Sequence, residues 1–235
     1  MKASEIMSRA STILLDDDYT RWTMTELAMW LTDALREVAL VVPKATSKNI
    51  TIPLVEGTRQ QLPANCQQLL RVVRNVDVEG DNLVGKGVIT IVQREGLDSQ
   101  NPNWHDGQYV RFRPYARHYV FDETDPLTFY VWPGNDGTGN IEAVVSVIPD
   151  AIKPVTGGDP DLLESYDVPL GVIDVYANAI LDYTLYRAYC KDAQNAGAAN
   201  RAGLFYQQFS QSLGIRANAE LVNSPNYKQT GNIAQ

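Results

Sequence analysis

The two histidines of the chain are the first residues to test for catalytic chemistry. His105 lies between Trp104 and Asp106, and a histidine beside a carboxylate can suggest a general base with an orienting group. Adjacent residues in an extended loop rarely face each other, so we expect His105 to make a surface-loop or interface contact. No serine stands in a nucleophile elbow, and neither cysteine has a histidine close in sequence. We therefore expect no enzymatic activity.

Three segments resemble ligand-binding loops in composition alone. Neither 85–87 nor 134–139 contains the Gly-Lys-Ser/Thr sequence that cradles phosphates and holds magnesium. The three aspartates at 16–18 lack the alternating spacing and terminal glutamate of a calcium loop. These glycines are typical of turns and the aspartates of a solvated helix end. We expect no cofactor and no metal.

One stretch combines basic and aromatic side chains. Arg111, Arg113 and Arg117 alternate with aromatic residues, a combination that binds single-stranded nucleic acid. In a strand, alternate positions face opposite sides, which would divide the aromatic residues between core and surface. A nucleic-acid-binding accessory factor that uses Arg111–Arg117 stays an alternative function.

Tyrosine is concentrated in a helical stretch near the C-terminus. Tyr183, Tyr186 and Tyr189 recur at intervals of three and fall off the main apolar line of this helix. Because tyrosine is enriched in protein interfaces, we predict that these three side chains form a subunit interface. The alternative is a place in the core.

Composition indicates a folded chain of 235 residues without a basic block. A net charge of −8 argues against tight binding to a nucleic-acid backbone, which needs clustered lysine and arginine. It is compatible with a lumen through which DNA slides. No apolar run approaches the ~20 residues that span a bilayer, and the N-terminus lacks the apolar region of a secretory signal, so we expect no membrane partner. Cys66 and Cys190 are expected to be buried and reduced.

Periodicity predicts helices in the first and last parts of the chain. Residues 4–15 have helical spacing, and a second helix starts at the capping box of Thr23 and Glu26 and ends at Pro43. Near the C-terminus, a helix has Pro169 near its first turn and runs to Lys191, and a last helix ends at a Gly214 cap.

The middle of the chain has the texture of β structure. The predicted strands are 49–54, 87–92, 109–113, 128–132 and 141–147. The last two flank the glycine-rich turn 133–139 and so predict a hairpin. Short strands with polar links indicate a small antiparallel sheet, a sandwich or an open barrel.

These elements predict an α+β fold. Segments 1–46 and 158–216 are expected to form one helical bundle, with 47–157 as an inserted antiparallel β domain, because each helical hairpin has one apolar face to bury. Residues 217–235 are too polar to build a core and are expected to form an extended C-terminal arm. The arm would dock on a partner through Leu221, Val222, Tyr227 and Ile233; a tail without a role is the alternative.

Several segments, in this order, resemble the adaptor (head–tail connector) proteins of tailed bacteriophages. They are the opening hairpin TRWTMTELAMWLTDALREVALVVP, the turn at 61–63 before an apolar run, the loop at 101–105, the strand at 126–133 and the closing helix LYRAYCKDA.

The resemblance implies a structural protein of the virion neck that assembles in the host cytoplasm. It implies a ring of about twelve copies docked on the portal protein; such a ring closes when each copy makes the same head-to-tail contact with the next. Genomic DNA would pass through the ring without sequence-specific binding, tail or nozzle proteins would attach below, and the C-terminal arm would reach into the portal. Another neck or tail-completion protein is the alternative within the structural class.

Overall fold

The computed structural model describes residues 1–122, 124–192, 194 and 196–222. The chain forms two compact units. The helical unit combines Met1–Ala45 with the residues from Pro149 onward, and the β unit is Thr46–Ile148. The connector residues 149–157 belong to the helical unit.

The first two helices of the helical unit start and end close to the predicted positions. Helix α1 is Ala3–Leu14 and helix α2 is Met24–Val41. The predicted capping box is confirmed: the Thr23 hydroxyl accepts the Glu26 N–H at 3.3 Å, and the Glu26 carboxylate accepts the Thr23 N–H at 3.1 Å. Pro43 starts a short 3₁₀ helix, Pro43–Thr46, directly after α2.

The first of the two C-terminal helices starts later than predicted, and the second ends later than predicted. The expected start near Pro169 is wrong, since α4 is Ala177–Lys191. The stretch before it contains the short 3₁₀ helices Leu163–Tyr166 and Asp174–Tyr176. The predicted cap at Gly214 is also wrong, because α5 is Ala196–Val222 and Gly214 lies inside it. The sequence after Gly214 contains good helix formers and no proline until Pro225, so nothing stops the helix there.

This longer helix corrects the predicted arm. Residues 217–222, expected to be extended, belong to α5. The remainder of the predicted arm, 223–235, lies outside the described residues.

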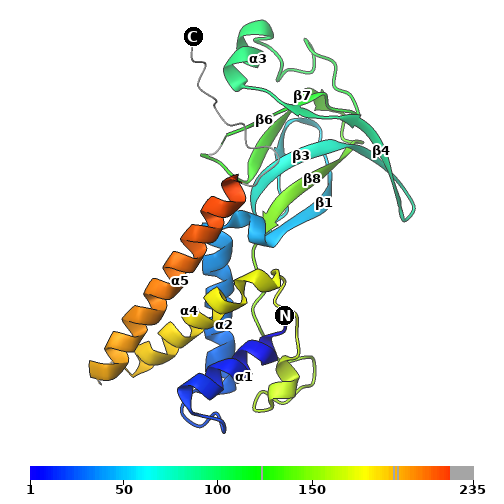
Figure 1. Ribbon diagram of the computed structural model, residues 1–235. Coiled ribbons are helices and arrows are strands. Elements are labelled where there is room, and N and C mark those ends of the chain that lie inside the picture. Colours follow the sequence, from blue (N-terminus) through cyan, green and yellow to red (C-terminus); the bar gives the residue numbers. More distant parts are fainter. Residues whose placement is uncertain (123, 193, 195, 223–235) are drawn as a thin grey trace, which may run out of the picture. The chain divides into compact units, whose positions relative to one another are not determined.

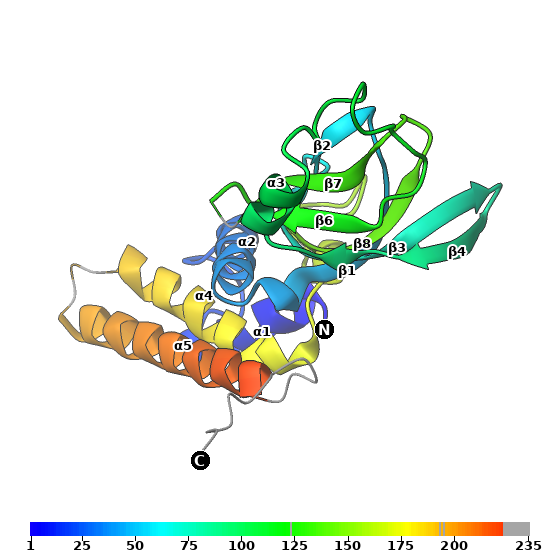
Figure 2. The ribbon, with the colours of Figure 1, turned by 90° about the horizontal axis from the view of Figure 1, so that it is seen from above.

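One hydrophobic core joins the helices of the helical unit. In Figures 1 and 2, α4 and α5 run side by side in opposite directions, and α2 also packs on α4. The largest fully buried side chains of this core come from segments far apart in the chain: Ile6, Met7, Leu27, Leu31, Leu35, Tyr166, Tyr176, Ile180 and Leu185. Their burial removes the apolar faces of both terminal parts from water.

The described residues of the β unit form two four-stranded sheets, and together with the helices of the other unit they confirm the α+β class. Figure 2 shows strands of both sheets. One sheet has the order β1-β8-β3-β4, with β1 Ser47–Pro53, β8 Asn140–Val147, β3 Cys66–Glu79 and β4 Asn82–Val88. The other has the order β2-β7-β6-β5, with β2 Gly57–Gln61, β7 Thr128–Asn135, β6 His118–Phe121 and β5 Thr90–Ile91. Both sheets contribute to one core, and the pairing is antiparallel except for β5 with β6. Helix α3 is Arg94–Gln100.

The predicted hairpin around the glycine-rich turn is wrong. β7 pairs with β2 and β6, whereas β8 pairs with β1 and β3 in the other sheet. The buried side chain of Asn135 holds the turn: it donates to the Pro114 carbonyl at 2.9 Å and accepts the N–H groups of Gly137 and Gly139 at 2.8 and 3.2 Å. A Cβ at Gly139 would lie 2.0 Å from the Pro114 oxygen. The turn therefore carries the chain from one sheet to the other.

Two predicted strands are also corrected. Residues 109–113 form a loop in which the N–H groups of Tyr109 and Val110 both donate to the Asp106 carbonyl. The predicted strand 87–92 is divided, because β4 ends at Val88 and β5 begins at Thr90 in the other sheet.

Candidate interaction surfaces

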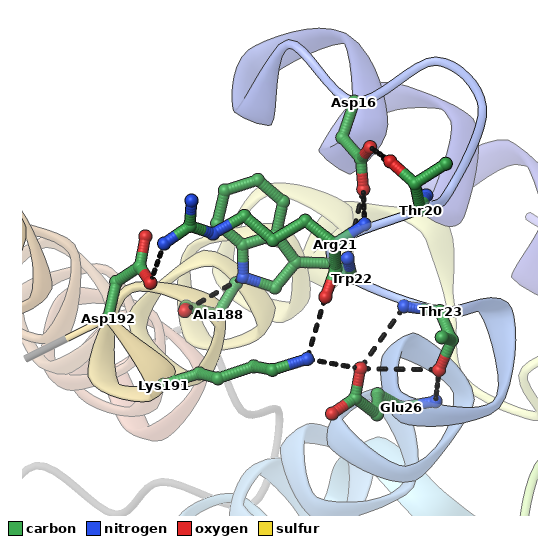
Figure 3. Close-up of polar contacts among 9 residues, drawn as sticks. All are labelled: Asp16, Thr20, Arg21, Trp22, Thr23, Glu26, Ala188, Lys191 and Asp192. Atoms are coloured by element: carbon green, nitrogen blue, oxygen red, sulfur yellow. Dashed lines mark hydrogen bonds and ion pairs between the residues drawn. The ribbon is translucent and has the colours of Figure 1, made fainter.

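A buried carboxylate organises the loop between α1 and α2 (Figure 3). Asp16 accepts the Trp22 and Arg21 N–H groups at 2.9 and 3.0 Å, and the Thr20 N–H and hydroxyl at 3.1 and 2.9 Å. Burial raises the pKa of Asp16, but the bonds from Trp22, Thr20 and Arg21 outweigh it, and the pKa lies below its usual value. Asp16 is only 9% exposed, so the solvated helix end predicted for residues 16–18 is wrong at this position.

The same loop is attached to the end of α4. The Trp22 Nε1–H donates to the Ala188 carbonyl at 3.0 Å, in the last turn of α4, where carbonyls lack helical partners. Lys191 donates to the Arg21 carbonyl at 2.6 Å and to Glu26 at 2.8 Å, and Arg21 forms an ion pair with Asp192. We call these contacts the loop–helix clasp. It joins the two segments, LYRAYCKDA and the opening hairpin, that carry much of the resemblance noted in the sequence.

Glu26 has two roles in the loop–helix clasp. Its carboxylate caps α2 and also accepts a hydrogen bond from the Lys191 ammonium group. Burial raises the pKa of Glu26, but the bonds from Lys191 and Thr23 lower it by more. The pKa of Glu26 therefore lies below its usual value. The Glu26 carboxylate is therefore held in its charged form.

The predicted interface tyrosines lie between α4 and α5. Tyr183 contacts Phe209 edge to face at 5.0 Å between ring centroids, and Tyr189 stacks on Phe205 at 5.6 Å. Both side chains are buried, whereas Tyr186 is half-buried and contacts Tyr206. Their role between subunits stays a prediction, and Tyr186 is the member of the three with the most exposed surface.

The outer face of α5 has a feature that the sequence analysis did not use. Residues 202–215 contain no charged side chain, in a chain of which 20% is charged. Leu204 and Ile215 on this stretch are 59% and 71% exposed and, eleven residues apart, lie on the same side of the helix, whereas the exposed Tyr206 lies near the opposite side and contacts Tyr186. We call this surface the neutral face of α5. The sequence signal for this surface is the run of fourteen residues without a charge, which a search for motifs does not detect.

The predicted docking residues of the arm are divided by the structure. Leu221 and Val222 lie in the last turn of α5. Tyr227 and Ile233 lie outside the described residues. Docking on a portal through these four residues stays a prediction.

The histidines make local contacts. His105 Nδ1 lies 2.7 Å from the Thr58 hydroxyl, and its ring packs on Trp104 with 3.7 Å between centroids. Burial lowers the pKa of His105, and nearby Arg94 lowers it further. Asp106 instead accepts the Gln108 N–H at 2.8 Å within its own turn.

The second histidine has a similar environment. His118 Nδ1 lies 2.6 Å from the Thr90 hydroxyl, and its ring stacks on Trp132. Both histidines therefore contribute to packing and hydrogen bonding within the second sheet and the loop that covers it.

The arginine-rich stretch lines a pocket of the β unit with a volume of 260 Å³. Its lining includes Asn101, Tyr109, Arg111, Arg113, Arg117 and Trp132. We call it the basic pocket, because every charged residue of its lining is an arginine. The structure thus brings the three predicted basic residues together beside Trp132 and Pro133 of β7, although the stretch is not a strand.

Other chemical features are few in the part of the chain that the structure describes. No group of three or more histidine, cysteine or acidic residues is placed there to hold a metal ion. Within those residues, no helix combines the length and apolarity needed to cross a membrane. Both cysteines are free; Cys66 is buried, which raises its pKa, but the expected burial of Cys190 is wrong because it is exposed.

Comparison with known proteins gives one match that spans both units. The family model described as SU10 adaptor protein matches residues 1–229. No curated protein matches the chain.

Proposed function

Because the chain belongs to the SU10 adaptor protein family, we propose that this structural protein of the phage head–tail junction forms a ring of about twelve copies beneath the portal. The ring extends the DNA channel and provides the surface to which tail or nozzle proteins attach. The family match over 1–229 carries this proposal, since it covers the helical unit and the β unit together.

The neutral face of α5 supports contact between copies. Charged residues are depleted in the cores of protein interfaces, and exposed apolar and tyrosine side chains are typical there. Leu204 and Ile215 supply an apolar surface without a charge that would have to be desolvated. A ring needs a head-to-tail contact, so this face would meet a different surface of the next copy.

Native mass spectrometry of the protein with its portal tests the ring. We expect a complex that contains about twelve copies of the 26.1 kDa chain per portal. Leu204→Glu with Ile215→Glu should abolish the multi-copy complex, while Leu162→Glu, which charges another exposed apolar residue of the helical unit, should leave it intact. Binding of a single copy, or no binding, would contradict the ring.

The C-terminal residues are the proposed portal-docking element, through Leu221, Val222, Tyr227 and Ile233. Large apolar and aromatic anchors dominate such contacts. One truncation removes 217–235 and cuts into α5, and a second removes only 223–235. We expect both to abolish co-sedimentation with portal rings. Binding by the shorter truncation alone would place the anchors at Leu221 and Val222, and full binding by both would disprove docking through this segment.

The proposed role is architectural and needs no catalysis or cofactor. The side chains that first suggested chemistry, such as His105, are engaged in packing. We expect no hydrolase, nuclease or ATPase turnover from the purified chain. Turnover that His105→Ala abolishes would overturn this proposal.

A further inference from the structure

The three arginines of the basic pocket are concentrated at one place, and their side chains have no partners among the described residues. Arg111, Arg113 and Arg117 are all exposed, and none has an ion pair or a side-chain hydrogen bond among the described residues. Two other arginines of the β unit are paired, Arg74 with Glu142 at 2.6 Å and Arg94 with Asp98 at 3.4 Å. Arg59 and Arg71 are exposed like the three arginines of the pocket, but neither of them lines it. Three positive charges are thus concentrated at one pocket of a protein whose net charge is −8.

Two aspartates whose backbone is hydrogen-bonded to the segment of the three arginines have carboxylates that are used by their own turns. Asp106 accepts the Gln108 N–H, and Asp136 accepts the Thr138 N–H at 3.1 Å and its hydroxyl at 2.6 Å. These bonds hold each carboxylate against the backbone of its own turn. Neither aspartate belongs to the pocket lining. The positive charge of the pocket is therefore available to an anion from outside the chain.

The backbone that carries the arginines is fixed to β7. Arg113 N–H donates to the Gly134 carbonyl and Arg117 N–H to the Trp132 carbonyl, both at 2.8 Å. The intervening Phe112 packs closely on Gly134, where a Cβ would lie 2.5 Å from its ring. The two bonds and this packing hold the segment at a set position, so the arginines are presented without first ordering a loop.

Aromatic rings stand beside the guanidinium groups. Tyr109 is 71% exposed at the pocket, and Trp132 forms another part of the lining. The Nε1–H of Trp132 is buried without an acceptor in the described part of the chain. Guanidinium groups match phosphate oxygens in geometry and charge, and exposed aromatic rings stack on bases of either sugar type.

We propose that the basic pocket binds the phosphates of a single nucleic-acid strand, with a base against the exposed ring of Tyr109. Nucleic acid fits better than an acidic peptide because the pocket joins phosphate-binding groups to stacking surfaces. The net charge of −8 opposes adsorption elsewhere, which confines the contact to this site. The inference goes beyond the adaptor ring, and it is tested on the isolated chain, so its failure leaves the ring untouched.

Fluorescence anisotropy with a labelled oligothymidylate of about twelve nucleotides tests the proposal at low salt. We expect saturable binding, with a slope of log affinity against log salt of about −2, as three neutralised phosphates require. Arg113→Ala with Arg117→Ala should weaken binding about tenfold or more and make the slope shallower by about 1.4, since two of the three phosphate contacts are lost. The matched control, Arg59→Ala with Arg71→Ala, removes the same charge from two exposed arginines outside the pocket and should change binding less than about twofold.

Competition with inorganic phosphate and with a duplex distinguishes binding of a single strand from binding of any phosphate. Inorganic phosphate should compete only weakly, because it has no base to stack, and a duplex of the same length should bind more weakly than the single strand. Equal weakening by both double variants would overturn the proposal, as would an absence of oligonucleotide binding. Binding of an oligoglutamate peptide in place of the oligonucleotide would also overturn it and identify an acidic protein segment as the ligand.

Discussion

The loop–helix clasp of the helical unit and the basic pocket of the β unit use charged side chains in opposite ways. In the helical unit, Arg21 and Lys191 bind groups more than 160 residues away in the chain and join the α1–α2 loop to α4. In the β unit, Arg111, Arg113 and Arg117 have no such partners among the described residues. The first arrangement uses charge to hold the shape of a unit, and the second leaves charge for a ligand. The predictions below test this division, from the largest expected effect on stability to the smallest.

Removing the central side chain of the loop–helix clasp should have the largest effect. Trp22→Ala is expected to lower the free energy of unfolding by about 3–5 kcal/mol, because it empties a buried aromatic site and leaves the Ala188 carbonyl without its donor. Trp22→Phe keeps most of the ring volume and should cost less. Urea denaturation measures both. A loss below about 1 kcal/mol for Trp22→Ala would show that the clasp does not contribute to the stability of the helical unit.

Removing the carboxylate that organises the loop should have the next largest effect. Asp16→Ala is expected to cost about 2–3 kcal/mol, because three backbone N–H groups lose a charged acceptor. Asp18→Ala changes an exposed neighbour and should stay within about 0.5 kcal/mol.

The Asp16 contribution should also depend on pH with a defined sign. Its folded-state pKa is lowered from 3.8, so the stabilisation is present above that value and is lost as pH falls through the folded pKa. Denaturation curves of wild type and Asp16→Ala should therefore converge in acid. A difference that is the same at pH 7 and in strong acid would contradict the assigned role.

A third substitution should stabilise the protein. Burial raises the pKa of Asp182 on α4 from 3.8 to about 6, and Arg9 offsets this only in part. The folded state thus penalises the charged form; the penalty is absent below pH 3.8 and complete above pH 6. After allowance for solvent screening of this half-buried group, Asp182→Asn should add about 1 kcal/mol at pH 7.

The pH dependence separates this effect from a general loss of charge. The gain from Asp182→Asn should grow between pH 4 and pH 6 and then stay constant, within about 0.3 kcal/mol. Asp150→Asn removes an exposed charge of the same unit and should show no such rise. If both variants behave alike, burial is not the cause.

The smallest expected effect on stability is that of removing the β unit, if the two compact units fold independently. Replacing 46–148 by a short glycine–serine linker should leave the helical unit folded, because its core draws on residues of that unit alone. Far-ultraviolet circular dichroism should retain the helical signal and a cooperative thermal transition. Loss of that signal would show that the helical unit needs the β unit to fold.

How well the sequence predicted the structure differs between the units for a physical reason. The capping box of Thr23 and Glu26 acts within four residues, so the start of α2 could be read from the chain. The stretch 128–147 looks like a hairpin locally, yet β7 and β8 pair with different strands. Strand pairing depends on segments distant in sequence, and no local pattern identifies the partner.

The sites show the same limit. Arg111, Arg113 and Arg117 could be identified from their types and spacing, but the pocket depends on β7, which supplies Trp132 and fixes their backbone. Tyr183 and Tyr189 were placed at a subunit interface, and only the packing of α5 shows that both are covered within one chain. The exposure of a helix face depends on its neighbours, which periodicity does not identify.

The sequence by itself determined the α+β class, the starts and ends of α1 and α2, and the resemblance to phage adaptors, because these rest on local hydrogen bonding, periodicity and residue order. Tertiary structure decided which strands share a sheet, how far α5 extends, and which charges are paired. Trp22 meets Ala188, and Lys191 meets Glu26, across more than 160 residues. Such contacts form only when the buried apolar faces bring distant segments together, and that collapse is a property of the whole unit.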